Sequence, residues 1–207
     1  MSKSRRTGGS WRERQERDPY VQMARRDGWR SRAVYKLEEM QKRYRLMKVG
    51  SDVLDLGSAP GAWSQYAAGI VGPKGRIVAV DLLDMEPITG VEFIRGDFRE
   101  QDTLDRINTS MGKRQLDLVM SDMAPNISGN RSVDQPRAMY LAELTAELAT
   151  EVLKPGGSMV LKLFHGEGFD DFVREIRPKF SSVRVRKPAA SRAQSRETYM
   201  VATGFRV

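Results

Sequence analysis

Four aspartates of this sequence stand at or just after the ends of short apolar runs, where ligand-binding side chains are often found. They are Asp55, Asp81, Asp97 and Asp122. Because the carboxyl ends of parallel strands meet at one edge of a sheet, we expect the four carboxylates to line one rim. A rim of negative charge attracts a cationic ligand and repels a pyrophosphate.

The first aspartate leads into a turn of small residues, "GSAPG" (57–61). Gly57 and Gly61 let a ligand approach the backbone where side chains would block it. A dinucleotide turn needs G-x-G-x-x-G, and this one has two glycines and a proline, so it matches a pyrophosphate-binding loop poorly. A tight strand-to-helix connection without a ligand is the alternative interpretation.

The cofactor that fits these charges best is S-adenosyl-L-methionine, a nucleoside with a sulfonium and an amino group. Asp81, 24 residues after Gly57, is spaced to accept both hydroxyls of a ribose. In "GDF" (96–98), Asp97 would face the adenine amino group with Phe98 beside it. The two glycines of the turn would accommodate the methionine portion, and Asp55 belongs to the same rim.

A lysine interrupts the apolar run "SMVLKLF" (158–164). Burying Lys162 without a partner would be costly, and Asp122 ends the preceding predicted strand. A ribose hydroxyl is a poor nucleophile that needs alignment and a proton acceptor. Lys162 could be a neutral base, if its pKa were lowered by burial or by a second cation, or a charged group that orients the hydroxyl. The sequence leaves both roles open.

The elements that must position these residues alternate between strand and helix patterns from residue 50 onward. The predicted strands cover 52–56, 76–81, 91–94, 116–122 and 158–164, with a closing pair at 181–187 and 197–205. Helical patterns cover 63–71, 101–110, 135–154 and 169–180, and "PGG" (155–157) is a helix stop. This alternation predicts a doubly wound α/β sheet.

The chain ahead of the sheet is basic. We predict a weakly ordered N-terminal tail over 1–28, an amphipathic helix from residue 30 to about 46, and a single domain over 29–207. Of the net charge of +8, residues 1–48 carry a balance of +9. Aromatic residues are interleaved with these charges, which suits phosphate contact and base stacking. A solvated helix face is the alternative.

The candidate RNA contacts in this basic segment are Arg25, Arg26, Arg30 and Arg32. A second basic cluster, "VRVRKPAASRAQSR" (183–196), contains no acidic residue. If the two clusters shared a face, they would form a track for a nucleic acid backbone.

Composition narrows the chemistry further. The chain has no cysteine and one histidine, so we expect no disulfide, no thiolate nucleophile and no metal site. No apolar stretch reaches the length of a membrane span, and no hydrophobic segment follows the basic N-terminus. We therefore expect a cytoplasmic protein that binds no membrane, and, in the absence of a heptad seam, a monomer.

Eight motifs follow one another from about residue 28 to the C-terminus: "SRAVYKL", "DLGSAPGAWSQ", "VAVDLLDM", "GDF", "SDMAPN", "LKPGG", "LKLF" and "SRETYMVATGF". As an ordered set they resemble the FtsJ/RrmJ family of ribosomal RNA large-subunit ribose methyltransferases, also called RlmE. The resemblance implies a Rossmann-like class I methyltransferase fold, with a mostly parallel seven-stranded sheet flanked by helices. It also implies methylation of a uridine 2′-hydroxyl in the A loop of 23S rRNA, and it favours the assembled large ribosomal subunit as substrate over naked RNA.

The resemblance assigns a catalytic tetrad to Lys36, Asp122, Lys162 and Glu197. It assigns cofactor contacts to Gly61, Trp63, Asp81, Asp97 and Asp122. Without the family, Lys36 would be a solvated charge on a helix, Glu197 an acid on an edge strand, and Trp63 a core residue.

Three other classes compete with this interpretation. A base-directed methyltransferase usually carries Asn/Asp-Pro-Pro-aromatic where this chain has "DMAPN" (122–126), and that motif is needed to stack a flipped base. An oxidoreductase that uses NAD is opposed by the missing third glycine. A non-catalytic RNA-binding protein of the same fold would be expected to lack Lys162 or Asp122, and both are present.

Overall fold

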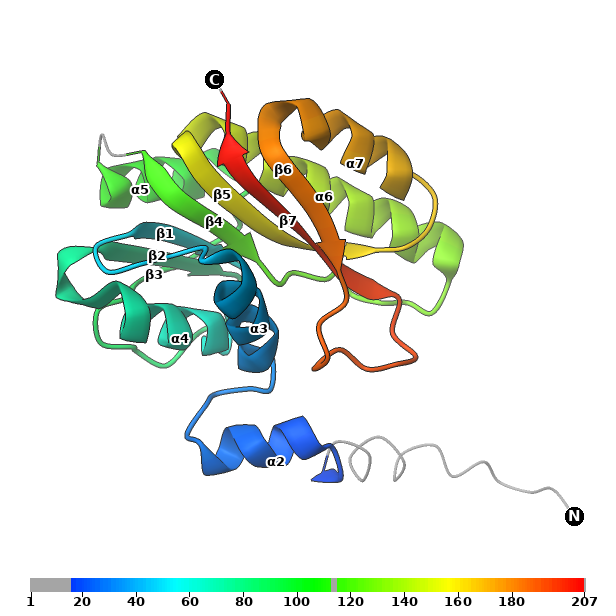
Figure 1. The fold of residues 1–207 in the computed structure, drawn as a ribbon, viewed down its shortest axis with the longest axis horizontal. Helices are drawn as coiled ribbons and strands as arrows, with labels where there is room; N and C mark the ends of the chain where they lie inside the picture. Colours follow the sequence, from blue (N-terminus) through cyan, green and yellow to red (C-terminus); the bar gives the residue numbers. More distant parts are fainter. Residues whose placement is uncertain (1–15, 113–114, 207) are drawn as a thin grey trace, which may run out of the picture.

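The computed structural model, which describes residues 16–112 and 115–206, contains one seven-stranded sheet in the order β3-β2-β1-β4-β5-β7-β6 (Figure 1). The strands are β1 Asp52–Leu56, β2 Arg76–Asp81, β3 Glu92–Arg95, β4 Leu116–Ser121, β5 Leu153–Phe164, β6 Phe180–Arg186 and β7 Glu197–Phe205. The helices are α2 Pro19–Arg26, α3 Val34–Tyr44, α4 Ala62–Val71, α5 Gln101–Met111, α6 Arg131–Val152 and α7 Phe169–Ile176, with 3₁₀ turns at Gly72–Lys74 and Arg177–Lys179.

Strand order reverses next to the centre of the sheet. From β1 the chain proceeds outward to β2 and β3, and then returns to place β4 on the other side of β1, all in parallel. At the far edge β7 lies antiparallel between β5 and β6. This arrangement confirms the doubly wound α/β sheet, its seven strands and the antiparallel closing pair. It also places the crevice for a ligand at the carboxyl ends of β1 and β4.

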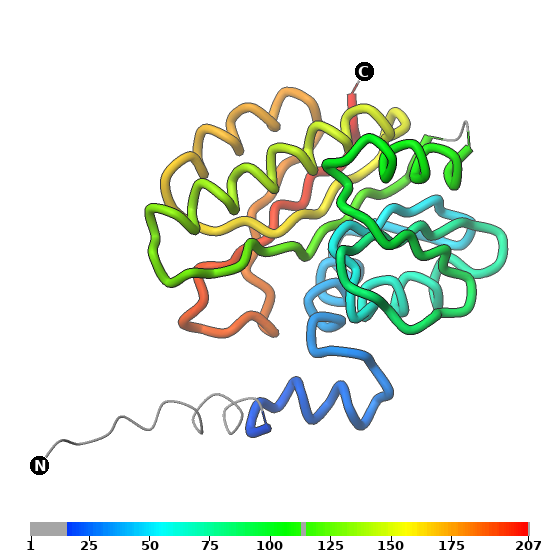
Figure 2. The backbone as a smooth tube through the Cα atoms, turned by 180° about the vertical axis from the view of Figure 1, so that it is seen from behind, coloured from blue at the N-terminus to red at the C-terminus, as the bar shows by residue number. Residues whose placement is uncertain are grey.

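Helices cover both faces of the sheet (Figures 1 and 2). One core cluster joins α3 and α4 to the sheet and includes Leu37, Trp63 and Leu118. The other joins α5, α6 and α7 to the opposite face and includes Ile107 and Phe172. Because the central strands are buried on both faces, their sequences are continuous apolar runs rather than alternating ones.

Three predicted helices differ from the structure by more than one residue at an end. The one predicted over 169–180 ends at Ile176 and is followed by the 3₁₀ turn Arg177–Lys179 and by β6 from Phe180. The helix predicted from residue 30 to about 46 covers only Val34–Tyr44, because the Arg30 amide is bound by the Gln65 side chain and Arg45 ends the helix in a left-handed conformation. The helix predicted to reach residue 154 begins at Arg131 and ends at Val152. Its expected stop sequence is instead the start of β5, where Leu153 pairs with Leu116 of β4.

The predicted tail over 1–28 also needs correction, because residues 19–26 form α2. Asp18 caps this helix by accepting the Tyr20 amide at 3.0 Å, and Pro19 occupies its first position, where a proline is well tolerated. The Tyr20 ring lies 5.6 Å from that of Tyr35 on α3. The part of the prediction that concerns residues 1–15 lies outside the described residues. Among the described helices, none has the length and apolar character of a membrane span.

Candidate active site

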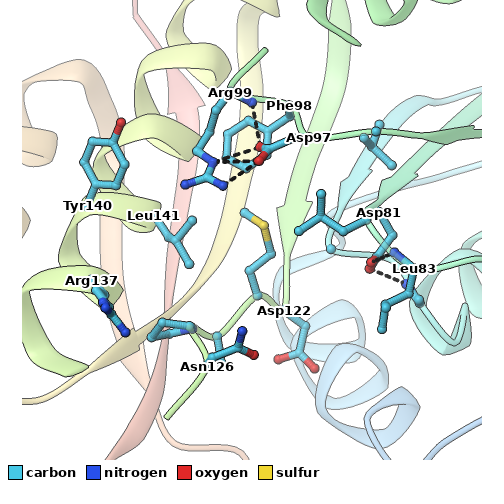
Figure 3. Close-up of a pocket in the computed structure, with 18 residues that line it drawn as sticks. Asp81, Leu83, Asp97, Phe98, Arg99, Asp122, Asn126, Arg137, Tyr140 and Leu141 are labelled. Carbon is cyan, nitrogen blue, oxygen red and sulfur yellow. Dashed lines mark hydrogen bonds and ion pairs between the residues drawn. The ribbon is translucent and has the colours of Figure 1, made fainter. Parts of the chain in front are cut away.

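Two adjoining cavities open at the carboxyl edge of the sheet, where the strand order reverses. The larger, of about 580 Å³, is lined by Gly57, Asp81, Asp97, Phe98 and Asp122 among others (Figure 3). The smaller, of about 90 Å³, shares Gly57 and Asp122 and adds Asp55 and Trp63. The structure therefore brings the four aspartates of the predicted rim to one place.

Asp81 holds the turn above the cavity. Its Oδ2 accepts the Ala59 amide and its Oδ1 accepts the Leu83 amide, each at 2.8 Å. Each carboxylate oxygen retains a further lone pair. Asp81 can therefore shape the turn and still accept hydroxyl groups of a ligand.

Asp97 forms a two-oxygen ion pair with Arg99. Arg99 Nε lies 2.8 Å from Oδ1 and 3.0 Å from Oδ2 (Figure 3), and this hydrogen bonding lowers the pKa of Asp97. Arg99 is not among the site residues predicted from the sequence. Across the cavity from Asp81, Arg137 and Tyr140 project from α6 (Figure 3), and they too were missed because nothing in the sequence brings α6 to this edge.

Asp55 lies on the floor of the smaller cavity and is buried. Its Oδ2 accepts a hydrogen bond from Ser64 Oγ at 2.5 Å. Burial, together with the charges of Asp122 and Asp81, raises the pKa of Asp55 to about 7 in spite of the Ser64 bond. This member of the acidic rim is therefore close to half-protonated at neutral pH.

The two glycines of the turn have different surroundings. At Gly57, with φ +74°, an added Cβ would lie 2.1 Å from Met123 Cγ, so the backbone contacts the segment that follows β4. At Gly61, with φ +102°, it would meet Met85 Sδ at 2.7 Å and Arg30 Nη1 at 3.0 Å. Gly57 lines both cavities, and Gly61 lies behind the turn, against Arg30.

The four residues of the predicted tetrad come together as two ion pairs. Lys162 Nζ lies 2.6 Å from Asp122 Oδ1, and Lys36 Nζ lies 2.8 Å from Glu197 Oε1. The two lysine side chains are only 9% and 10% exposed, respectively, so each charge needs its partner.

Tyr199 joins the two pairs. Its hydroxyl accepts a hydrogen bond from Lys36 Nζ at 2.9 Å and donates one to Asp122 Oδ1. The antiparallel register of β5 and β7 places Tyr199 directly opposite Lys162, and opposite residues present their side chains on the same face. Tyr199 is not among the residues predicted from the sequence, although period-two alternation from Glu197 on the same strand indicates that the two share a face.

Charges within this cluster set its ionisation. Partial burial would raise the pKa of Asp122, but the charges of Lys162 and Lys36 and the hydrogen bonds from Lys162 and Tyr199 outweigh it and lower that pKa. Glu197 follows the same pattern, with Lys36 as the main opposing charge. Burial and the two carboxylates raise the pKa of Tyr199. The two acids are therefore ionised and the phenol is neutral.

Trp63 packs against Tyr199 of this cluster. Its indole Nε1 donates a hydrogen bond to the Ala33 carbonyl at 2.8 Å, and its ring lies 5.8 Å from that of Tyr199. The side chain is buried in the core and also lines the smaller cavity. Trp63 thus combines the core position expected without the family with the cavity position that the resemblance implies.

The four candidate RNA contacts separate into two groups. Arg25 and Arg26 are exposed on α2. Arg30 instead donates to three main-chain carbonyls, those of Pro60 at 3.0 Å, Glu86 at 2.6 Å and Pro87 at 2.8 Å. Arg32 is largely buried and contacts Asp18 and the Ala190 carbonyl.

This chain is similar in sequence to known proteins over a range that includes every residue of the candidate site. The family model described as FtsJ-like methyltransferase matches residues 29–205. The ribosomal RNA large subunit methyltransferase E of Marinobacter nauticus is 54% identical over 207 residues, with 100% of both chains covered.

Solved structures share the fold. A Plasmodium falciparum protein described as a ribosomal RNA methyltransferase superposes with a TM-score of 0.76 at 25% identity, covering 86% of this chain and 98% of that one. A Clostridium thermocellum protein described as an rRNA methylase superposes with a TM-score of 0.56 at 17% identity, covering 81% and 96%, which concerns the fold alone.

Proposed function

This chain belongs to the FtsJ-like methyltransferase family, and from that premise we propose that it methylates the 2′-hydroxyl of a uridine in the A loop of 23S rRNA. The observation that carries the proposal is the pairing of Lys162 with Asp122, and of Lys36 with Glu197, beside an acid-lined cavity. The relative from Marinobacter nauticus is named for the large subunit rRNA, which supports this substrate.

The cavity fits S-adenosyl-L-methionine as methyl donor. The carboxylates of Asp81 and Asp122 on the cavity wall suit a ribose and a cation. Gly57 lines the cavity with backbone alone, and its missing Cβ leaves room for Met123. Asp81 would hold the ribose, Asp97 and Phe98 the adenine, and Asp55 and Gly57 the methionine portion. When bound, this cofactor supplies an electrophilic sulfonium methyl group.

The protein's own contribution is to align the hydroxyl, whose proton would pass to solvent water as its oxygen takes the methyl group. Lys162 donates one N–H to Asp122 Oδ1 and one to the Asp122 carbonyl oxygen, at 2.8 Å for the latter. An ammonium has three N–H donors, so one is left for the 2′-oxygen of the target ribose. Because a carboxylate lies against Lys162, we propose that it acts as a charged, orienting group rather than as a neutral base.

Lys36 and Glu197 complete the alignment. Through Tyr199, Lys36 holds Asp122, and Asp122 in turn holds Lys162. The cluster has two cations and two anions, so it does not repel a neutral hydroxyl or a cationic methyl donor. Its role is positioning, which can contribute several kcal/mol to a transfer reaction.

The remaining features of the proposal concern the partner. Exposed Arg25 and Arg26 on α2 would contact rRNA phosphates. We propose that the substrate is the assembled large ribosomal subunit and that the enzyme acts in the cytoplasm as a monomer, with residues 29–207 as its single methyltransferase domain.

Mapping of ribose methylation on rRNA tests this function. In a strain that lacks this protein, one A-loop uridine should lose its 2′-O-methyl group, and the purified protein with S-adenosyl-L-methionine should restore it on isolated large subunits. A full complement of A-loop methylation in the deletion strain would refute the proposal.

A further inference from the structure

Asp18 lies between two arginines that come from distant parts of the chain. Its Oδ2 contacts Arg32 Nη1 and lies 3.6 Å from Arg192 Nε. Arg192 belongs to the loop between β6 and β7, which extends toward α2 in Figure 1. A single carboxylate oxygen thus ties the start of α2 to this loop.

The guanidinium groups of Arg32 and Arg192 lie close together although their positive charges repel each other. Burial, followed by the charge of Arg192, lowers the pKa of Arg32. The Asp18 side chain is 9% exposed, and the Arg32 and Arg192 side chains are 16% and 38% exposed. An anion is therefore needed between the arginines, and in the free protein Asp18 provides it.

The Asp18 carboxylate offers only one oxygen to the two guanidinium groups. Asp18 Oδ1 is already used to cap α2 through the Tyr20 amide, so only Oδ2 faces the arginines. A phosphate offers more oxygens to two guanidinium groups and forms paired hydrogen bonds with each. Beside Asp18 there is a cavity of about 500 Å³, lined by Tyr20, Arg32, Ser191 and Arg192 among others, which has room for such a group.

The position is adjacent to the catalytic cluster. Ser191, on the wall of this cavity, is close enough to Glu197 to contribute to the lowering of its pKa. Arg32 donates to the Ala190 carbonyl, and four residues further along the chain Lys36 pairs with Glu197. A phosphate held here would belong to a nucleotide that flanks the methylated ribose.

We propose that Asp18 occupies, in the free protein, a phosphate subsite of Arg32 and Arg192 for the RNA backbone beside the target nucleotide, and that RNA displaces it. The inference rests on the proposed function, because it takes the ligand to be substrate RNA. Its consequence is that the start of α2 competes with RNA for the two arginines and must leave the loop when the substrate binds.

Neutral variants at Asp18 test this competition. Asn and Ser both keep the helix cap, so Asp18→Asn and Asp18→Ser remove the charge and retain α2. Each should tighten binding to large ribosomal subunits from a strain lacking the protein about 3- to 10-fold, the range of a released ion pair. The matched control is Glu16→Gln, which removes the same charge from an exposed position two residues earlier and should change affinity less than twofold.

An Arg192→Gln background separates competition from general charge effects. If Asp18 competes for the two arginines, Asp18→Asn should gain much less affinity when Arg192 is absent. Equal gains for Asp18→Asn and Glu16→Gln, or an equal gain with and without Arg192, would overturn the subsite. Affinity is measured by co-sedimentation, independently of methyl transfer, so subunits that bind and are not methylated would count against the proposed function alone.

Discussion

Lys162 Nζ lies 2.6 Å from Asp122 Oδ1 and 2.8 Å from the main-chain carbonyl oxygen of the same residue. One residue thus fixes the lysine through both its side chain and its backbone, at the point where β4 ends beside β5. Two acceptors on one residue restrict rotation of the ammonium, and one of its three N–H groups is left for the target hydroxyl.

Removing the hydroxyl that joins the two ion pairs should slow methyl transfer. Tyr199→Phe keeps the ring against Trp63 but leaves Lys36 and Asp122 without their common partner. We expect a loss of about 10-fold in the single-turnover rate, the equivalent of one buried hydrogen bond, with cofactor affinity unchanged. The control is Tyr44→Phe, which removes a phenol that binds Arg186 and none of the four tetrad residues. Equal rates for the two variants would contradict a positioning role for Tyr199.

The buried carboxyl of Asp55 should make the free protein less stable as pH rises. In the unfolded chain Asp55 ionises near its ordinary pKa of 3.8, and in the folded protein its pKa is about 7. Between these values the folded state retains a proton that the unfolded state has lost, so raising the pH favours unfolding, and the full penalty is reached above pH 7. Asp55→Asn has no such penalty and can still accept the Ser64 bond.

Denaturant unfolding at pH 5 and pH 8.5 measures this difference. The stability advantage of Asp55→Asn over the wild type should grow by roughly 2 to 3 kcal/mol between the two pH values. A constant difference would show that Asp55 is ionised in the folded protein throughout this range.

The turn before α4 should tolerate no side chain at Gly57. Gly57→Ala would place a methyl group 2.1 Å from Met123 Cγ at a φ of +74°. Gly90→Ala is the matched control, because Gly90 has a φ of +81° and no heavy atom within 4 Å of its added Cβ. Both variants should lose about 1 kcal/mol of unfolding free energy to the left-handed backbone, and Gly57→Ala should lose more and also weaken cofactor binding. Equal losses would mean that Met123 moves aside without cost.

The exposed arginines of α2 should contribute to RNA binding through charge alone. Arg25→Gln with Arg26→Gln should weaken binding to large subunits and flatten its dependence on salt, since each lost phosphate contact lowers the slope by up to about 0.9. Arg30→Gln should leave the salt slope unchanged and instead loosen the turn at Pro60, because its donors are used by carbonyl groups. A reduced salt slope in Arg30→Gln would show that Arg30 contacts RNA. An unchanged slope in the double variant would show that Arg25 and Arg26 do not.

The sequence was sufficient to predict the sheet and its acidic edge for a physical reason. Strands that are buried on both faces are predominantly apolar, so the residues from Val53 to Leu56, apart from Asp55, and from Ile77 to Val80 were recognisable as strands. Parallel strands then bring their carboxyl ends together, so the sequence alone is enough to place Asp81 and Asp122 at one edge of the sheet.

The tetrad could be assigned only through the resemblance, and the contacts beyond it depend on tertiary structure. Tyr199 meets Lys162 because of the β5–β7 register, which no local pattern specifies. Arg30 resembles any other basic residue until the loop at Glu86 and Pro87 is in place around it. Helix α2 was missed although Tyr20, Met23 and Ala24 recur at helical spacing, because its eight residues lie in a basic segment that was assigned to the tail. Its stability comes from its cap and its contacts with α3 and the β6–β7 loop.

The single-turnover rate of ribose methylation by Lys162→Ala, measured across pH on large ribosomal subunits with saturating S-adenosyl-L-methionine, tests the central claim most directly. If Lys162 orients the 2′-hydroxyl, the rate should fall about 100-fold or more while cofactor and subunit affinities stay close to those of the wild type. If Lys162 is charged, the rate of the wild type should show no increase with pH that is absent from Lys162→Ala. Near-wild-type turnover by Lys162→Ala would contradict the assignment of this lysine to the reaction, and a rising limb that depends on Lys162 would show that it acts as a base.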